Sequence, residues 1–385
     1  MTARTAGARR HLWPTASAAG LALALALAGC SGSTSDDDAG STSTSTSTSG
    51  SSSTATAGSG DVVALAEAFS ATLDEDQQEA LEQEYTFENA ANWSNLPNSL
   101  LGGGGGPGGG GGSTSSGRVG LQTDSLTDEQ WAALDALLDG VTGSAPDEGY
   151  DEVVQHLAAD DYLADNGGGD AYGRGQFFVA FLGTPSDSGT WGLQFGGHHL
   201  AIANTYVDGQ LAGATPSFRG IEPFETVEVD GTTVQPEQQE AAAFNALLES
   251  LDDDQLATAE LSSSYNDLLL GPGEDWAFPE TAEGIPGSEL TDEQRDLLLA
   301  AVQTYVGDID DENAAAVLAT YESQLDDTYV SWAGSTAMTE IGDYVRVDGP
   351  QVWIEFSQQN GVVLDGAHPH AVWRDKVTDY AGTTS

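Results

Sequence analysis

The sequence predicts an α+β domain made of two fused helix-plus-strand repeats that form one pseudo-symmetric unit. Three observations predict this class. Short motifs recur in the same order in both halves, helix-start signals precede helical apolar spacing in each half, and strand patterns bounded by turn residues come late in each half. We expect the duplicated domain to span residues 61–382, with repeats of about 61–235 and 236–382.

The recurring motifs are short but ordered. Residues 126–130 (LTDEQ) return unchanged as 290–294, and residues 73–77 (LDEDQ) return as 251–255 (LDDDQ). Residues 177–183 (FFVAFLG) resemble 328–334 (TYVSWAG), and the pairs Trp93/Trp276 and Trp191/Trp353 complete the series. The shared order favours a duplication over chance similarity.

Helices are predicted after each copy of the LTDEQ motif. Thr127 is expected to cap a helix with Gln130 completing a capping box, and Thr291 with Gln294 repeats this arrangement. Apolar residues follow at helical spacing in both copies. A further helix is expected over residues 310–325.

Strands are predicted late in each half. Residues 176–182 form the first, and residues 190–195 and 198–207 read as a hairpin that turns at Gly196-Gly197. The second half predicts strands at 344–347, 352–356 and 362–364, with turns at 348–349 and 360–361. The glycine tract at 102–117 is expected to be a disordered insertion in the first half.

The N-terminus has the pattern of an export signal. Three arginines precede an apolar stretch of residues 18–28, which is too short to span a membrane, and the stretch ends at Cys30. The ending Leu27-Ala28-Gly29-Cys30 resembles a bacterial lipobox, and the resemblance implies lipidation of Cys30. We therefore expect a signal peptide over 1–29, a flexible Ser/Thr/Gly linker over 30–60, and an extracytoplasmic protein anchored to the lipid bilayer.

The charge of the chain is strongly negative. The whole sequence has a net charge of −51, and removal of the predicted signal leaves 7 basic against 61 acidic residues, a net charge of −54. Such a surface repels nucleic acid, so no nucleic-acid partner is expected. Because Cys30 is the only cysteine and is assigned to lipid, no disulfide can form within the folded part.

Two histidine clusters follow the late strands of the two halves. They are His198-His199 and His368-Pro369-His370. In an extended segment His368 and His370 share one face, because strand side chains alternate, and at least one residue of the first cluster is expected to join them. Three imidazoles with an open position suit zinc or copper, and addition of Glu222 or Glu355 would suit non-haem iron. The sequence therefore predicts a transition-metal site.

The alternative is a metal-free module that binds a small polar ligand or a glycan. Basic residues are rare in the chain, so those beside the histidine clusters are candidates for binding a carboxylate or phosphate. The candidate ligand-binding residues are Arg219, Glu222, Glu355, Trp373, Arg374 and Asp375. The competing interpretation is that Arg374 pairs with an acidic residue of the fold.

Several familiar catalytic motifs are absent from the sequence. It contains no Gly-x-Ser-x-Gly elbow, no phosphate loop and no Cys-x-x-Cys-His haem motif. The sequence therefore names no reaction, and it leaves open whether the protein is an enzyme.

Four motifs carry a resemblance to a known family. They are residues 191–200 (WGLQFGGHHL), 216–223 (PSFRGIEP), 352–356 (VWIEF) and 368–375 (HPHAVWRD). Together they resemble the bacterial domain family DUF3500 over most of residues 61–382. The resemblance implies a domain but no activity. The glycine tract and the acidity are departures that lie outside these motifs.

Overall fold

The computed structural model describes residues 59–101, 117–229 and 231–384. They belong to one compact unit, Thr54–Ser385. The predicted signal, the tether up to residue 58 and the glycine tract through residue 116 lie outside the described residues. Within the described residues no helix is both long and apolar enough to cross a membrane. The unit combines helices with one large mixed sheet, so the predicted α+β class is confirmed.

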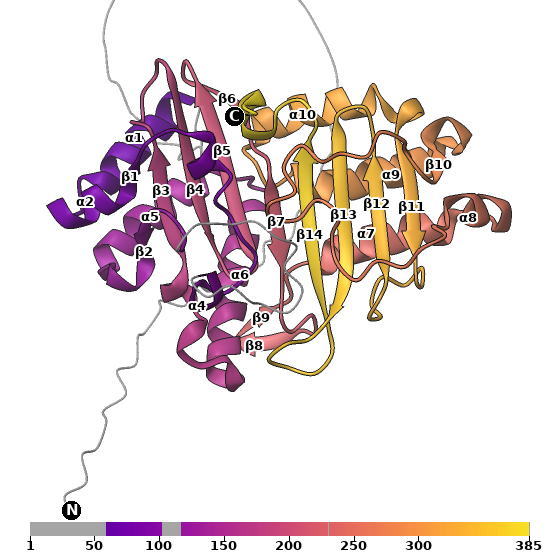
Figure 1. Cartoon of the computed structure of the whole chain (residues 1–385), viewed down its shortest axis with the longest axis horizontal. Coiled ribbons are helices and arrows are strands. Elements are labelled where there is room, and N and C mark those ends of the chain that lie inside the picture. Colours follow the sequence, from indigo (N-terminus) through magenta and orange to yellow (C-terminus); the bar gives the residue numbers. More distant parts are fainter. Residues whose placement is uncertain (1–58, 102–116, 230, 385) are drawn as a thin grey trace, which may run out of the picture. The chain divides into compact units, whose positions relative to one another are not determined.

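The sheet has twelve strands and runs through both halves of the domain (Figure 1). Its main path is β1-β3-β4-β5-β7-β14-β13-β12-β11-β10, with β2 paired to β3 and β6 to β5, and every pair is antiparallel except β1 with β3. The strands are β1 (Glu82–Gln83), β2 (Leu121–Gln122), β3 (Phe178–Leu182), β4 (Thr190–Gly197), β5 (Leu200–Val207), β6 (Gln210–Gly213), β7 (Ser217–Gly220), β10 (Ile285–Pro286), β11 (Tyr329–Ala333), β12 (Tyr344–Asp348), β13 (Val352–Asn360) and β14 (Ala367–Asp375). A separate small ribbon pairs β8 (Val227–Val229) with β9 (Thr232–Val234).

The longer helices cover one face of the sheet. They are α1 (Ser59–Ser70), α5 (Asp128–Val141) and α6 (Gly149–Leu163) in the first half, and α7 (Gln238–Ser250), α9 (Asp292–Val306) and α10 (Asp311–Glu322) in the second. The short helices are α2 (Glu75–Leu81), α3 (Phe87–Ala90), α4 (Asn98–Leu101) and α8 (Asp253–Ala259). Figure 1 shows α7 and α9 behind strands β11–β14.

Both predicted capping boxes are present, and each is extended by the same hydrogen bonds. Gln130 caps α5 and also donates to the carbonyl of Thr72 and to the side chain of Gln77. Gln294 caps α9 and donates to the carbonyl of Ser250 and to the side chain of Gln255. Each buried glutamine thus joins two helix starts, because its amide group both accepts and donates.

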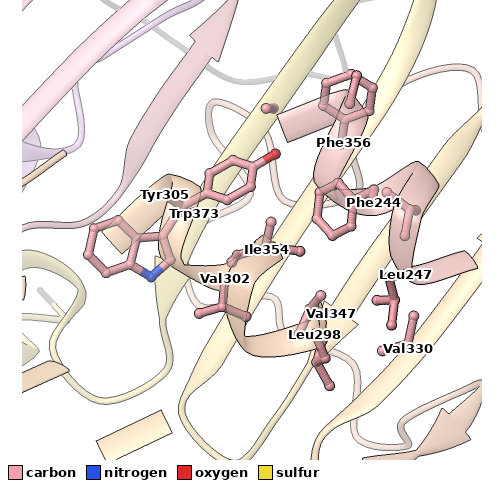
Figure 2. Packing of buried hydrophobic residues seen from close by; sticks show 14 of the residues in the cluster. Phe244, Leu247, Leu298, Val302, Tyr305, Val330, Val347, Ile354, Phe356 and Trp373 are labelled. Carbon is pink, nitrogen blue, oxygen red and sulfur yellow. The ribbon is translucent and has the colours of Figure 1, made fainter. Parts of the chain in front are cut away.

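The core of the second half is a layer between the helices and the sheet. Phe244 and Leu247 of α7 and Leu298 of α9 pack against Val330, Ile354 and Phe356 of the sheet (Figure 2). A second cluster fills the same layer in the first half, where Leu134, Leu137 and Leu138 of α5 meet β3–β5. The helical spacing predicted for α5 therefore faces the sheet, as an amphipathic helix should.

Strand β14 divides its side chains between the two faces of the sheet. Ala371 and Trp373 belong to the helix-side core, whereas Val372 belongs to a cluster on the opposite face with Phe218 and Trp93. Because side chains alternate along a strand, His368 and His370 lie on the face of Val372, away from the helices.

Two local predictions were wrong. The hairpin turns at His198-His199, and Gly196-Gly197 end strand β4 instead. A Cβ on Gly196 would lie 2.5 Å from the carbonyl oxygen of Leu200, so close approach explains the glycine. Residues 362–364 form a loop, because their three amides donate to Glu222 Oε1 and have no strand partner.

The order of elements recurs in the two halves. The series β2, α5, α6, β3, β4, β5 is followed by β10, α9, α10, β11, β12, β13. Trp191 lies on β4, whose counterpart in this order is β12, whereas Trp353 lies on β13. This pair of tryptophans therefore does not align in the recurring order, and pseudo-symmetry of the whole domain stays a prediction.

Candidate metal centre

The His198-His199 turn is held tightly at the end of the β4–β5 hairpin. Arg118 donates to the carbonyl of Gly197 at 2.7 Å and to two carbonyls of the preceding loop, and the amide of His199 donates to the carbonyl of Asn95. His199 has φ 63°, a left-handed conformation that the tight turn requires. Burial lowers the pKa of Arg118 to about 10 despite the nearby charge of Asp160.

The second cluster lies at the start of β14. Pro369 lies inside the sheet, because β14 lies between β7 and β13. Its carbonyl accepts from the amide of Ile221, just beyond the last residue of β7. In an antiparallel strand, the amide and the carbonyl of one residue point toward the same neighbouring strand. Pro369 has no N–H to donate, and its backbone faces β7 at the point where the pairing of β7 with β14 has ended.

Three imidazole nitrogens converge where the two clusters meet. His370 Nε2 lies 3.2 Å from His368 Nε2 and 3.3 Å from His199 Nε2. All three side chains are buried, and a ligand nitrogen from each lies within 4.8 Å of the others. A single hydrogen on His370 Nε2 cannot point straight at both neighbours, whereas a cation between the three lone pairs can bind all of them. Buried His groups of this kind could hold a metal ion, as the sequence predicted.

A carboxylate orients one of these histidines from behind. His370 Nδ1 lies 2.9 Å from Asp267 Oδ1, so Nδ1 carries the hydrogen and Nε2 keeps its lone pair toward the other two rings. Burial raises the pKa of Asp267, but the hydrogen bond and charge of His370 outweigh it and leave the pKa below its ordinary value. This is the arrangement in which a second residue fixes the tautomer of a metal-ligating imidazole.

The other two histidines are held in the neutral form. Burial lowers the pKa of His199 well below its ordinary value, with a further decrease from the neighbouring histidines. Burial and the charges of His370 and His198 lower the pKa of His368 to about 3. Neutral imidazoles have the lone pairs that metal binding needs, so both rings are ready to act as ligands at neutral pH.

His198 lies beside this trio but does not converge with it. Its ring stacks on His199 with centroids 3.6 Å apart, and its Nδ1 lies 2.7 Å from Asp160 Oδ1. The other oxygen of Asp160 accepts the amide of Gly173, and Tyr172 packs edge-on against His198. The structure thus brings together three of the four predicted metal ligands, and we name His199, His368 and His370 the histidine trio.

Neither acidic residue proposed from the sequence as an additional ligand joins the trio. Glu222 Oε1 accepts the three amides of residues 362–364. Glu355 is buried and accepts from two backbone amides, Trp353 Nε1 and Tyr344 Oη. Four donors occupy the Glu355 carboxylate, so its role is to tie the 269–270 loop to the sheet.

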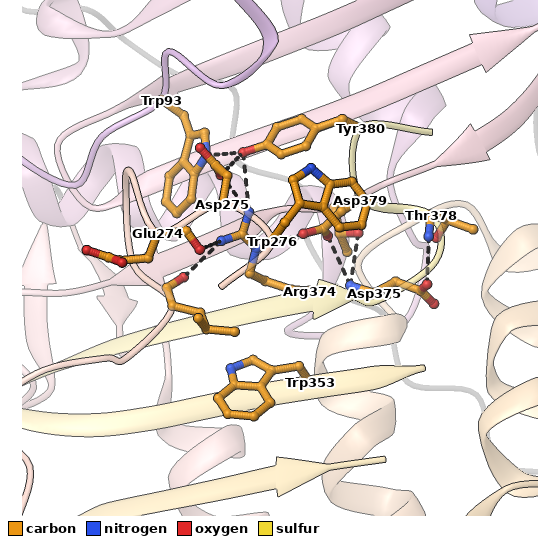
Figure 3. Close-up of polar contacts among 12 residues, drawn as sticks. Trp93, Glu274, Asp275, Trp276, Trp353, Arg374, Asp375, Thr378, Asp379 and Tyr380 are labelled. Atoms are coloured by element: carbon orange, nitrogen blue, oxygen red, sulfur yellow. Dashed lines mark hydrogen bonds and ion pairs between the residues drawn. The ribbon is translucent and has the colours of Figure 1, made fainter. Parts of the chain in front are cut away.

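The residues proposed to bind a small ligand are also used inside the fold. Arg374 is fully buried, pairs with Asp379 and Asp275, and donates to the carbonyl of Glu274 (Figure 3). Trp373 donates to Tyr321 on the helix side. The competing interpretation of Arg374 as an ion-pair partner therefore fits the structure.

Asp375 and Arg219 are likewise engaged. Asp375 accepts from two amides of its own turn and from the hydroxyl of Tyr321. Arg219 points to the helix-side face, where it pairs with Glu152 of α6 and with Asp308. Neither side chain is left to meet a ligand in the way the sequence suggested.

Asp160 and Asp267 were missed by the sequence reasoning. Asp267 lies in a long loop and Asp160 on a helix, each more than 35 positions from the histidine that it contacts. No local pattern marks them among 61 acidic residues. His156 is buried on α6, and its Nδ1 is hydrogen-bonded to the carbonyl of Glu152.

Comparisons with known proteins identify one family. A family model described as "Protein of unknown function (DUF3500)" matches residues 55–382. No curated protein and no solved structure matches the chain.

Proposed function

Since the chain belongs to the DUF3500 family, whose description assigns no activity, we propose a function from the site itself: the histidine trio binds a transition metal. The observation that carries the proposal is the spacing of the three Nε2 atoms, with His370 3.2 and 3.3 Å from its two neighbours. Tetrahedral bonds of about 2.0–2.1 Å to zinc place ligand nitrogens roughly 3.3–3.4 Å apart. The two spacings at His370 therefore match those of metal-bound imidazoles, and ligand nitrogens of His199 and His368 lie within 4.8 Å of each other.

The three ligands leave a fourth tetrahedral position open. A three-histidine centre of this type holds water or substrate there, and it lowers the pKa of bound water to about 7. Asp267, which orients His370 from behind through Nδ1, has half of its side chain exposed to solvent. The arrangement supports metal-activated water chemistry, such as hydrolysis, better than electron transfer, because it offers no sulfur ligand among the described residues.

Elemental analysis tests this proposal. Purified wild-type protein should contain one zinc, copper or iron per trio, and His368→Ala and His370→Ala should lose that ion while remaining folded. The matched control is His198→Gln, which removes a neighbouring imidazole but keeps a donor for Asp160, and it should retain the metal. Wild-type protein that binds no Zn²⁺ or Co²⁺ at micromolar concentration would exclude the centre.

We also propose that the protein is an extracytoplasmic lipoprotein anchored through Cys30. The support is the sequence order of arginines, short apolar stretch and Leu-Ala-Gly-Cys ending. Cys30→Ala should abolish lipid labelling and remove the protein from the membrane fraction. A variant that is still lipid-labelled and membrane-bound would exclude this anchoring.

We propose, finally, that the domain is a duplication of one helix-plus-strand unit. Two features support it: the recurring element order and the matching hydrogen bonds of Gln130 and Gln294. An experimental structure in which residues 121–207 do not superpose on residues 285–360 would exclude it.

A further inference from the structure

A second group of metal-type ligands lies away from the trio, on the helix side of the sheet. Its members are Glu148, Glu152 and His156, which recur every fourth residue along α6, and Glu237 and Glu240 at the start of α7. Ligand atoms of Glu152, His156 and Glu237 lie within 4.8 Å of one another, and so do those of Glu148, Glu152 and Glu240. The two groups share Glu152. We name these five residues the carboxylate cluster.

Two carboxylates of the cluster are buried without partners. Glu237 and Glu240 are both 0 % exposed, and neither oxygen of either carboxylate is hydrogen-bonded to another described residue. The hydroxyl of Tyr305, also fully buried, has no hydrogen bond among these residues either. Figure 2 shows its ring in the apolar core of the second half. Buried polar groups are almost always satisfied, so these orphaned atoms indicate a missing partner.

His156 points to the nature of that partner. Its Nδ1 lies 2.9 Å from the carbonyl of Glu152, which can only accept, so Nδ1 carries a hydrogen. The other ring nitrogen, Nε2, lies 3.5 Å from Glu237 Oε1, and neither atom makes a hydrogen bond to a described residue. An imidazole nitrogen and a carboxylate oxygen at this separation are both ligand atoms that a cation between them can bind.

The charge balance points the same way. Arg219 is the cation that pairs with carboxylates of this region, and it already forms ion pairs with both Glu152 and Asp308. The region therefore gathers five buried or half-buried carboxylates, those of the cluster and Asp308, around one guanidinium. Unpaired buried charges cost several kcal/mol each, so the group requires protons or metal ions. Burial raises the pKa of Glu152 and Glu240 well above ordinary values, and the neighbouring carboxylates raise both further.

We propose that the carboxylate cluster is a second metal site, which binds two divalent cations of the Mn²⁺ or Fe²⁺ class with Glu152 shared between them. One ion is held by Glu152, His156 and Glu237, and the other by Glu148, Glu152 and Glu240. Four carboxylates with one imidazole suit such cations better than zinc or copper(I). The cluster is separate from the trio, because Arg219 faces the helices whereas the adjacent Gly220 faces the rings of His199 and His370.

A small pocket lies beside the cluster. Gly149, Arg219, Asp308, Thr142 and Asn204 are among the residues that line it. Arg219 thus contacts both the pocket and Glu152, and its guanidinium partly neutralises and orients the shared carboxylate. Ions of a two-metal site are about 3.5–4 Å apart, a separation that one bridging carboxylate can span.

Manganese binding in a variant without the histidine trio tests the proposal. His199→Ala/His370→Ala protein is stripped with a chelator and titrated with Mn²⁺ in 200 mM salt, where the diffuse acidic surface is screened. We expect two Mn²⁺ per chain, with an exchange-coupled electron paramagnetic resonance signal. Glu240→Gln and His156→Ala should each lose one ion, and Glu152→Gln should lose both.

The control is Glu322→Gln, which removes an exposed carboxylate of α10. It should leave the stoichiometry at two. Uptake of fewer than two ions by folded protein, or two ions that survive Glu240→Gln and His156→Ala, would overturn the proposal. Glu152→Gln removes the partner of buried Arg219 and could unfold the chain. The test therefore depends on Glu240→Gln and His156→Ala, each of which should lose one ion. Failure here would leave the trio unaffected, since its ligands are absent from the protein used.

Discussion

His370 Nε2 lies 3.3 Å from His199 Nε2, although the two residues are 171 positions apart in the chain. The contact forms because β14 and the β4–β5 turn both meet β7, whose residues Gly220 and Arg219 pair with His370 and Leu200. The centre of the sheet, where the two halves join, is thus where the histidine trio is assembled.

Asp267→Asn should weaken metal binding by the trio. The carboxylate fixes His370 with Nδ1 protonated, and an amide can present its NH₂ group instead and favour the other tautomer. Loss of such a partner typically lowers metal affinity about 10–100-fold. Competition titration with a zinc chelator measures the change, with the exposed Asp326→Asn as control. Equal affinity in the two variants would show that Asp267 does not position the ligand.

Gly220→Ala should disturb the trio and also strain the pairing of β7 with β14. A Cβ at this position would lie 2.9 Å from the carbonyl oxygen of Pro369, 3.0 Å from His370 Cδ2 and 3.2 Å from His199 Cδ2, so the strand and both rings would have to move. Metal sites tolerate only about 0.5 Å of misplacement, and we expect at least about a tenfold loss of affinity. The same chelator competition, with circular dichroism to verify folding, makes the measurement. Unchanged affinity would mean that the rings are not held as closely as the structure indicates.

Arg374→Lys should destabilise the domain by about 3 kcal/mol, because a lysine keeps the charge but cannot bridge Asp379 and Asp275 as the guanidinium does. Chemical denaturation gives the free energy of unfolding. The matched control is Arg174→Lys, whose pair with Asp161 is well exposed, and it should cost less than about 1 kcal/mol. Similar losses in both variants would contradict the structural role of Arg374.

Gln130→Ala and Gln294→Ala should destabilise the protein by similar amounts. Each removes half of a capping box and the bonds to a second helix, which together are worth about 2 kcal/mol. Denaturation of both variants beside wild-type protein tests the equivalence. A loss of stability in only one of the two variants would show that the two hydrogen-bond networks contribute differently despite their matching geometry.

Metal-free protein should lose stability as the pH rises from 7 to 9. The pKa of Glu148 is raised to about 9, mainly by burial and then by Asp308, and Glu152 and Glu240 shift in the same direction. In the unfolded chain these groups ionise near pH 4.5, so between the two pKa values the native state binds more protons than the unfolded state. Stability is therefore present at low pH and falls with rising pH by up to about 1.4 kcal/mol per pH unit for each group.

In the window from pH 7 to 9 the unfolded chain's histidines, with an ordinary pKa near 6.5, are mostly neutral, and so are His199 and His368 in the native state. Chelator-treated wild-type protein and Glu322→Gln should show the same slope of unfolding free energy against pH. Glu240→Gln, which removes one titrating group, should show a shallower slope. A flat profile in wild-type protein would mean that the carboxylates ionise in the native state near their ordinary pKa values.

Local structure was predictable from the sequence wherever neighbouring residues decide it. The capping boxes at Thr127 and Thr291 and the apolar face of α5 follow from short-range hydrogen bonding and periodicity. The predictions of a hairpin turn at Gly196-Gly197 and of a strand at 362–364 were wrong because tertiary contacts determine the conformation of those segments. Gly197 is small because the ring of Phe177 packs against it, and residues 362–364 are drawn to Glu222.

The sequence by itself determined the α+β class, the likeness to a family and the four histidines worth attention, since these depend on residue types, spacing and short motifs. Only the tertiary structure decided that His199 joins His368 and His370 while His198 turns to Asp160, and that Arg374 is an ion-pair partner. It also placed Glu237 and Glu240 beside Glu152 and His156. The physical reason is that sheet pairing and helix packing bring together residues far apart in the chain, and no local pattern records which distant side chains will meet.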